Sequence, residues 1–134
     1  MSEELGPESI EDPVDFFATL GYLHGAAIDA LTVQVLDQVA TIFVDDIYAA
    51  LEGQADYPGA RPCALSFFGV SNFSLDVDIS DGARIAALRA IESAKGVTLY
   101  SLEIDLNIGG ASRGKSLALG FSALEVEDAE IDAD

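Results

Sequence analysis

The sequence has no tryptophan, one cysteine, one histidine and only six basic residues. The lone cysteine, Cys63, cannot form an internal disulfide. One cysteine and one histidine cannot supply the usual four-ligand zinc site from this chain alone. No apolar run approaches the ~18 residues that a membrane-spanning helix needs. These absences predict no metal site, no cofactor and no membrane partner.

The beginning of the sequence also lacks the features of a secretory signal. Its first residues, MSEELGPESIEDP, contain neither a basic segment nor an apolar one. Together with the single cysteine, this predicts a cytoplasmic protein.

Positive charge is scarce and confined to one region. The chain has 24 acidic and 6 basic residues, for a formal net charge of -18, and residues 1–60 and 116–134 contain no Lys or Arg. Such a surface repels nucleic acids and anionic membranes, and it attracts basic partners. Nucleic acid is therefore excluded as a partner. Two interpretations remain open: the acidity only keeps the protein soluble, or it steers a basic protein partner.

What the sequence does contain is enough apolar residues for a folded core. Half of its 134 residues are hydrophobic, which suits one domain. We expect an acidic flexible tail over residues 1–11 and a single α+β domain over residues 12–134.

Two segments have helix signals. The Asp-Pro pair at residues 12–13 places an N-cap before a first-turn proline and predicts a short helix over residues 13–20. Residues 83–95 carry Ile85 and Leu88 on one helical face and predict the main helix.

Alternating patterns predict strands over most of the remaining chain. The alternation of Leu31, Val33 and Val35 predicts a face that points into the core. The clearest alternation lies in residues 73–79, and the glycine-rich residues 109–115 predict a hairpin loop. The predicted core face of residues 73–79 consists of Phe73, Leu75, Val77 and Ile79.

The two halves of the predicted domain contain segments with a similar pattern. "ALSFFGVSNFSLDV" and "LALGFSALEVED" each read as a strand, a short bend containing Gly, Phe and Ser, and a second strand. Two explanations stay open: an internal duplication, or the self-similarity of any meander of alternating strands.

Candidate chemistry is sparse. His24 lies at the entry to a strand, where an imidazole can bond an unpaired backbone group, so we expect a structural role. Cys63 begins an apolar strand, which predicts a buried and inert thiol. The stretch "DVDISDGAR" at residues 76–84 fails the spacing of a calcium loop and is better explained by outward acids and a helix cap. We expect no catalytic residue and no enzyme.

Some acidic residues lie on or beside predicted strands rather than in tails. If the first hairpin and the last strand are neighbours, these residues form a continuous negative patch for a basic partner. The candidate partner-binding residues are Asp45, Asp46, Glu125, Glu127 and Asp128.

Two segments carry a family resemblance. "YLHGAAIDALTVQV", residues 22–35, resembles the aromatic-His-(Asp/Gly)-Ala-x-Ile-x-x-Leu opening of certain small bacterial immunity-type proteins from polymorphic toxin systems. "ALSFFGVSNFSLDV", residues 64–77, resembles the strand that follows it in those families. The segments cover under a third of the chain, and Gly25 stands where those families usually have Asp. The resemblance implies a β-rich, non-enzymatic binding protein without naming its target.

These observations predict a mostly antiparallel sheet or half-open sandwich with the main helix at residues 83–95 and a short N-terminal helix. The expected function is a non-catalytic binding protein, in the form of a cognate inhibitor of a basic protein partner. The alternative is a homodimeric structural or small-molecule-binding module.

Overall fold

The computed structural model of the protein describes residues 8–51, 53–55, 57–75, 84–92, 100–108 and 111–129. In these ranges the regular elements are mostly antiparallel strands, with one short α-helix and two 3-10 turns. The predicted α+β class with mostly antiparallel sheets is therefore confirmed. The elements are β1 (Glu8–Ser9), α1 (Pro13–Thr19), η1 (Gly21–Leu23), β2 (Ile28–Gln34), β3 (Val39–Val44), η2 (Ala49–Leu51), β4 (Cys63–Phe68), β5 (Ser71–Leu75), β6 (Arg84–Glu92), β7 (Tyr100–Ile108), β8 (Ala111–Phe121) and β9 (Ala123–Asp128).

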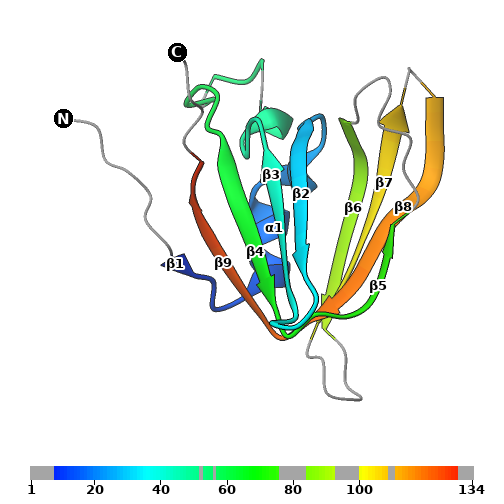
Figure 1. Ribbon diagram of the computed structural model, residues 1–134. Helices are drawn as coiled ribbons and strands as arrows, with labels where there is room; N and C mark the ends of the chain where they lie inside the picture. The colour runs from blue at the N-terminus through cyan, green and yellow to red at the C-terminus, as the bar shows by residue number, and fades with distance from the viewer. Residues whose placement is uncertain are drawn as a thin grey trace, which may run out of the picture.

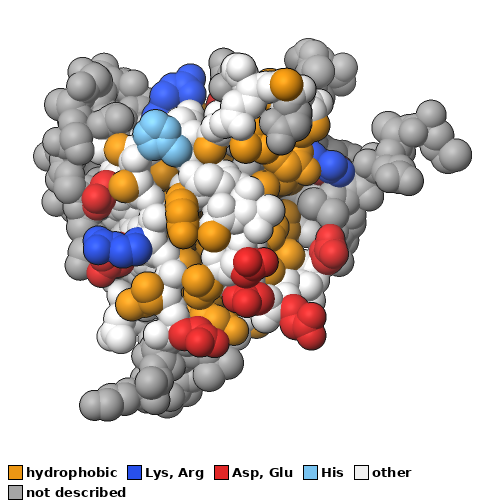
Figure 2. Space-filling view, turned by 180° about the vertical axis from the view of Figure 1, so that it is seen from behind, with side chains coloured by type: hydrophobic (Ala, Val, Ile, Leu, Met, Phe, Trp, Pro, Cys, Tyr) orange, Lys and Arg blue, Asp and Glu red, His pale blue; other side chains and the backbone are white. Residues whose placement is uncertain are grey.

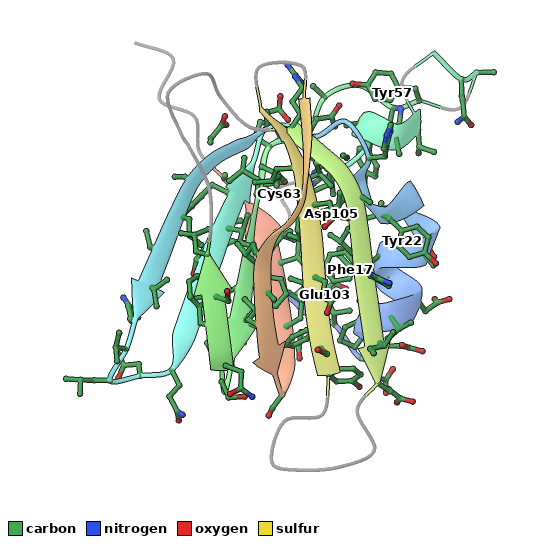
Figure 3. The ribbon with its side chains drawn as sticks, turned by 90° about the vertical axis from the view of Figure 1, so that its right-hand side faces the viewer. Phe17, Tyr22, Tyr57, Cys63, Glu103 and Asp105 are labelled. Carbon is green, nitrogen blue, oxygen red and sulfur yellow. The ribbon has the colours of Figure 1, made fainter. Side chains whose placement is uncertain are left out.

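The described strands form two sheets. The larger sheet has the order β1-β9-β4-β3-β2, and the smaller sheet has the order β5-β8-β7-β6. The two sheets join through both chain crossings at the lower end of Figure 1. At the upper end, the residues just before β2 bond to the start of β6, with the Ile85 N–H donating to the Ala26 carbonyl and the Gly25 N–H donating to the Ile85 carbonyl, both at 2.8 Å. Helix α1 contacts β6 and lies along that side of the smaller sheet (Figure 3). The arrangement is a half-open sandwich with α1 along one side.

The short N-terminal helix is confirmed, and it joins the core of the sandwich. Asp12 is its N-cap and accepts a hydrogen bond from the backbone N–H of Asp15 at 3.2 Å. Phe17 of α1, Phe67 of β4 and Phe121 of β8 are fully buried. The ring of Phe67 lies 6.5 Å from that of Phe17 and 4.9 Å from that of Phe121, centroid to centroid. One aromatic side chain therefore links the helix to both sheets.

The chain crosses between the sheets twice at the same place. β4 leads into β5 through Gly69, and β8 leads into β9 through Ser122 (Figure 1). The backbone N–H of Ser122 donates to the carbonyl of Phe68 at 2.8 Å. The two bends that the sequence predicts from its repeated Gly-Phe-Ser pattern are thus the two sheet crossings, and they bond to each other.

The prediction of a main helix at residues 83–95 is wrong, because Arg84–Glu92 is strand β6. The register against β7 shifts between Ile85 and Ala87, which marks a β-bulge. The extra residue places buried Ile85 three positions before buried Leu88, which imitates a helical spacing. Beyond the bulge the strand alternates normally.

The two predicted core faces on β2 and β5 are only partly correct. Leu31 and Val33 pair with the buried residues Ile42 and Ala40, so their face is the predicted one. Val33 is nevertheless 41% exposed and Leu75 is 46% exposed. Both strands lie at sheet edges, where one neighbour is missing. Val35 is 79% exposed in the turn after β2, and Phe73 is half-buried against the core.

Two further boundaries differ from the prediction. The predicted loop at residues 109–115 is shorter, because β8 begins at Ala111 and pairs with β7 from there. The predicted tail contains β1, whose Glu8 and Ser9 pair with β9. Several predicted features lie outside the described residues. They are Val77, Ile79, the proposed cap and calcium-like stretch at residues 76–83, and the end of the predicted helix at residues 93–96.

Candidate functional site

Three of the five candidate acids meet at one end of the larger sheet. The strand register places Val44, Cys63 and Asp128 side by side across β3, β4 and β9. Asp45 and Asp46 follow Val44 directly. The first hairpin and the last strand are therefore not neighbours as the prediction of a continuous patch required, because β4 lies between β3 and β9.

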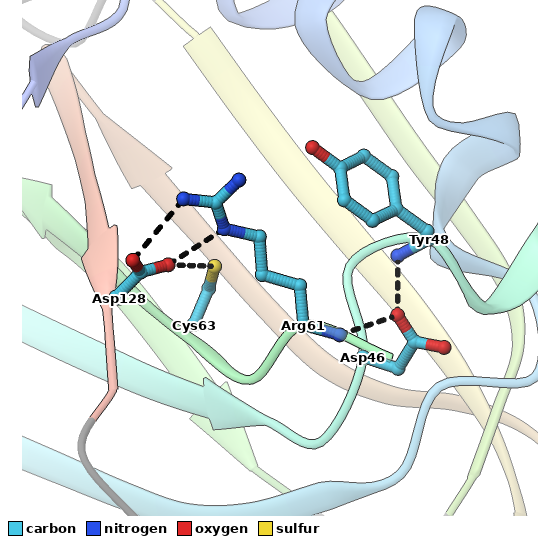
Figure 4. A network of polar contacts seen from close by, with 5 residues as sticks. All are labelled: Asp46, Tyr48, Arg61, Cys63 and Asp128. Carbon is cyan, nitrogen blue, oxygen red and sulfur yellow. Dashed lines mark hydrogen bonds and ion pairs between the residues drawn. The ribbon is translucent and has the colours of Figure 1, made fainter. Parts of the chain in front are cut away.

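Asp46 is a buried anchor rather than a surface charge. Its side chain is only 6% exposed. Oδ1 accepts from the backbone N–H groups of Tyr48 at 2.9 Å and Arg61 at 3.1 Å, and Oδ2 accepts from the Tyr57 hydroxyl at 2.6 Å. Figure 4 shows the two backbone bonds. The carboxylate therefore fastens both ends of the segment between β3 and β4 and is not available to a partner.

Asp128 is neutralised within the chain. Arg61 donates from Nε to Oδ1 at 2.7 Å and from Nη2 to Oδ2 at 3.1 Å, a two-point contact (Figure 4). The bond to the carboxylate raises the pKa of Arg61. The side chains of Arg61 and Asp128 are 34% and 26% exposed. This ion pair ties the segment before β4 to the end of β9.

Cys63 lies beside the ion pair but has the properties of an inert thiol. It is fully buried, and its Sγ lies 3.8 Å from Asp128 Oδ1. Burial and the neighbouring carboxylate raise the pKa of the thiol to about 12. A nucleophilic cysteine needs the opposite shift, so the predicted inert role fits this geometry.

Asp45 also has a structural contact. Its Oδ1 accepts from the backbone N–H of Ala27 at 2.8 Å, and its own N–H donates to the Ala27 carbonyl at 3.0 Å. The half-buried carboxylate thus fixes the segment that leads into β2. Only Glu125 and Glu127, of the five candidates, carry no such contact in the described part of the chain.

Glu125 and Glu127 lie on the outer face of the larger sheet. Their neighbours Leu124 and Val126 are buried on the inner face, so the two carboxylates point the other way. Across the sheet, Glu125 aligns with Ser66 of β4, which aligns in turn with Thr41 of β3. The hydroxyls of Thr41 and Ser66 lie 3.2 Å apart. Other members of this face are Ala64, Phe68, Val39, Phe43, Ala30, Thr32 and Gln34.

His24 does not have the predicted contact. Its side chain is exposed and makes no hydrogen bond with the described residues, while its backbone N–H donates to Gly21 at 3.3 Å. Figure 2 shows hydrophobic, acidic and basic side chains interspersed over the side of the molecule that faces away from the viewer of Figure 1. The corner is held instead by Leu23, which is fully buried although its φ is 55°. Arg84 donates to the Gly25 carbonyl at 2.9 Å from the neighbouring strand.

Among the described residues, no group of three or more His, Cys, Asp or Glu side chains is placed to hold a metal ion. A shallow pocket of about 300 Å³ between the start of α1 and the end of β6 is lined by Asp12, Val14, Ala90, Ile91 and Glu92. None of the described helices has both the length and the apolar character to cross a membrane.

Sequence reasoning missed two surface features. Arg61 carries the ion pair that removes Asp128 from the acidic surface, and nothing in the local sequence couples these distant residues. The open edge of β2 was also missed, because an alternating pattern gives the face of a strand but not its place in the sheet. A signal for the edge was present in Val35 and Leu36, two consecutive apolar residues at a turn.

No family model, no curated protein and no solved structure matches the chain. Function is therefore inferred from the surfaces described above.

Proposed function

We propose that this chain is a non-catalytic cytoplasmic protein that binds a basic protein, as expected of the immunity-type proteins that two of its segments resemble. The proposal rests on one observation: Glu125 and Glu127 have no counter-ion among the described residues, whereas the arginines with described side chains already have acceptors within the molecule. The resemblance adds a role, inhibition of a basic toxin, that the surface chemistry accommodates.

Each arginine with a described side chain has an acceptor inside the molecule. Arg61 binds Asp128, Arg89 binds Glu103 at 3.0 Å, and Arg84 binds a backbone carbonyl. Of these carboxylate partners, Glu103 lies on the smaller sheet, on the outward face of β7 in Figure 3. The intramolecular ion pairs therefore leave the outer face of the larger sheet negative.

The outer face of the larger sheet also has the composition of an interface. Val39, Phe43 and Phe68 are half-buried there and do not belong to the hydrophobic core. The Thr41–Ser66 pair lies between them, and Glu125 and Glu127 lie toward one side. Apolar and aromatic groups with a charged margin are typical of surfaces that bind proteins. The carboxylates supply long-range attraction, and the apolar groups supply contact area.

Association kinetics test this proposal. A basic partner isolated from native lysate should associate ~10 to 1000-fold faster at low salt than when its charges are screened, because opposite charges steer the encounter. Glu125→Gln/Glu127→Gln should flatten that dependence while the dissociation rate changes little. Asp15→Asn/Glu92→Gln removes the same charge near α1 and serves as the matched control. An acidic partner, or an association rate that ignores salt, would leave the acidity as a solubility feature.

A homodimer is the second candidate, and the exposed edge of β2 favours it. Light scattering at physiological salt measures this directly. A stable dimer at physiological salt would favour the homodimer over the basic partner as the function of the chain.

A further inference from the structure

β2 is an exposed edge strand with apolar side chains. It ends the larger sheet, and β3 is the only described strand that pairs with it along Ile28–Gln34. Most of its side chains are exposed, including Val33 at 41%. The apolar exposure continues into the following turn, where Val35 is 79% exposed and Leu36 is 98% exposed. An edge of this kind offers unpaired backbone groups to another strand.

The usual protections of a free edge are few in β2. The strand contains no Lys and no Pro, and Asp29 is its single charged residue. A register shift between Ile28 and Ala30 disturbs the pairing only at its beginning. The segment from Ala30 to Gln34 is regular and remains fit to pair.

We propose that β2 is the docking strand of this protein and that an extended segment of the basic partner adds to it as a further strand of the larger sheet. This inference rests on the proposed function and specifies how the partner is held. Strand addition supplies affinity through main-chain hydrogen bonds and specificity through alternate side chains.

Charge selects a basic segment over a second copy of this chain. Asp29 and Asp37 are exposed at the two ends of β2 and have no counter-ion among the described residues. Residues 1–60, which include the whole edge, contain no Lys or Arg, and Arg84 of β6 lies beside Ala27, just before the edge begins. A second copy would bring another net charge of -18 against this edge. A segment with Lys or Arg at both ends meets attraction instead.

The neighbouring side chains define the rest of the segment. Leu31 and Val33 share the inner face, so alternate residues of an added strand should be apolar there. Thr32 and Gln34 share the outer face with Thr41 of β3, so the intervening residues should be polar. The expected occupant is a strand of alternating apolar and hydroxyl residues with basic residues at its ends.

The experiment uses the 15N-labelled full chain and the synthetic peptide KKVTVTVKK as the probe. We expect saturable amide shifts over residues 28–35 and slower hydrogen exchange of edge amides on addition of the peptide. Val33→Glu should weaken binding of the peptide at least tenfold, although it adds negative charge. The reason is that it replaces an apolar side chain on the inner face of β2 with a charge that must lose water when the added strand packs there. Ile91→Glu is the matched control at a 56% exposed apolar position on β6 and should change binding less than twofold. If Val33→Glu loses the fold, Val33→Ser takes its place, because it removes the apolar contact on the pairing strand without adding a charge, and it should still weaken binding.

Several results would overturn the docking strand. One is that the amide shifts centre on elements other than β2. Another is that KKGSGSGKK or EEVTVTVEE binds as tightly as KKVTVTVKK. A third is that Val33→Glu and Ile91→Glu change the affinity equally. Self-association of the free protein that Val33→Glu abolishes at physiological salt would assign the edge to a second copy.

The kinetics separate this inference from the proposed function. If the natural partner depends on Glu125 and Glu127 but ignores Val33→Glu, the docking strand is wrong and the basic partner stands. If the peptide binds at β2 but the natural partner ignores salt and charge, the proposed basic partner is wrong and the docking strand stands.

Discussion

At the scale of single residues, the carboxylates that appear equivalent in the sequence divide into three kinds. Asp46 is a buried acceptor, Asp128 is an ion-pair partner, and Glu127 is exposed. The difference lies in what each meets across the sheet. The sequence could place the acids on strands, but it could not show that Arg61 reaches Asp128 or that Tyr57 reaches Asp46, because these contacts depend on the path of the chain between β3 and β4.

Removing the Asp46 carboxylate should strongly destabilise the protein. Asp46→Ala leaves two backbone N–H groups and the Tyr57 hydroxyl without their acceptor, and we expect a loss of about 3 kcal/mol in the free energy of unfolding. Tyr57→Phe removes the 2.6 Å bond to the carboxylate but keeps the two backbone bonds to Asp46, and it should cost about 1 kcal/mol. Urea denaturation measures both values. A loss below that of Tyr57→Phe would show that water replaces the carboxylate and that the anchor is dispensable.

The raised pKa of Cys63 predicts a loss of stability at alkaline pH. The thiol has a pKa of about 12 in the folded protein against an ordinary value of 9.0. Between these values the unfolded chain loses the proton while the folded protein keeps it, so stability falls as pH rises from about 9 toward 12. The free energy of unfolding of the parent should therefore fall relative to that of Cys63→Ala as pH rises through this window. Below about pH 9 the difference between the two proteins should stay constant. A constant difference throughout would contradict the pKa shift.

At the scale of elements, periodicity was a better guide to strand faces than to element type. It placed Leu31 and Val33 on the correct face of β2. The capping residue Asp12 and the proline after it, rather than periodicity, identified α1. Periodicity failed at β6, because a bulge converts strand spacing locally into helix spacing. Residues 84–92 form a strand because they pair with β7, and strand pairing depends on the whole sheet rather than on the local sequence.

The sheet crossing at Gly69 gives a prediction at this scale. Gly69 has a φ of +67°, and a Cβ there would lie 3.0 Å from Ser122 Oγ and 3.1 Å from Ser122 Cβ. Gly69→Ala combines an unfavourable left-handed conformation with a collision between the two crossings, and it should cost about 2 to 3 kcal/mol. Gly53→Ala is the control, since Gly53 has a φ of +89° with open space around its added Cβ. Its cost should be about 1 kcal/mol.

Thermal or urea unfolding measures the loss of stability of each variant, and a double variant separates the cost of the left-handed backbone at residue 69 from the cost of the contact with Ser122. Adding Ser122→Gly to Gly69→Ala should recover the steric part if the two bends pack as described. Equal costs for Gly69→Ala and Gly53→Ala would mean that the crossings tolerate the extra methyl group.

At the scale of the whole molecule, charge and topology act on the same edge. Edge strands usually carry their own protection, yet β2 has little of it. A net charge of -18 repels identical copies and attracts basic segments, so it can substitute for the missing protection. In the proposed function, the same carboxylates therefore attract the basic partner and oppose the pairing of β2 with a second copy.

This dual role of the charge predicts when the protein should self-associate. Near pH 4.1, where the sequence has no net charge, repulsion between copies disappears, and light scattering should detect association that is absent at pH 7. Val33→Lys places a positive charge on β2 and should suppress that association. Ile91→Lys adds the same charge on β6 and should suppress it less, because it leaves the β2 edge unchanged. Equal suppression by the two variants would mean that net charge alone governs association, whereas suppression specific to Val33→Lys identifies β2 as the strand that the acidic surface protects.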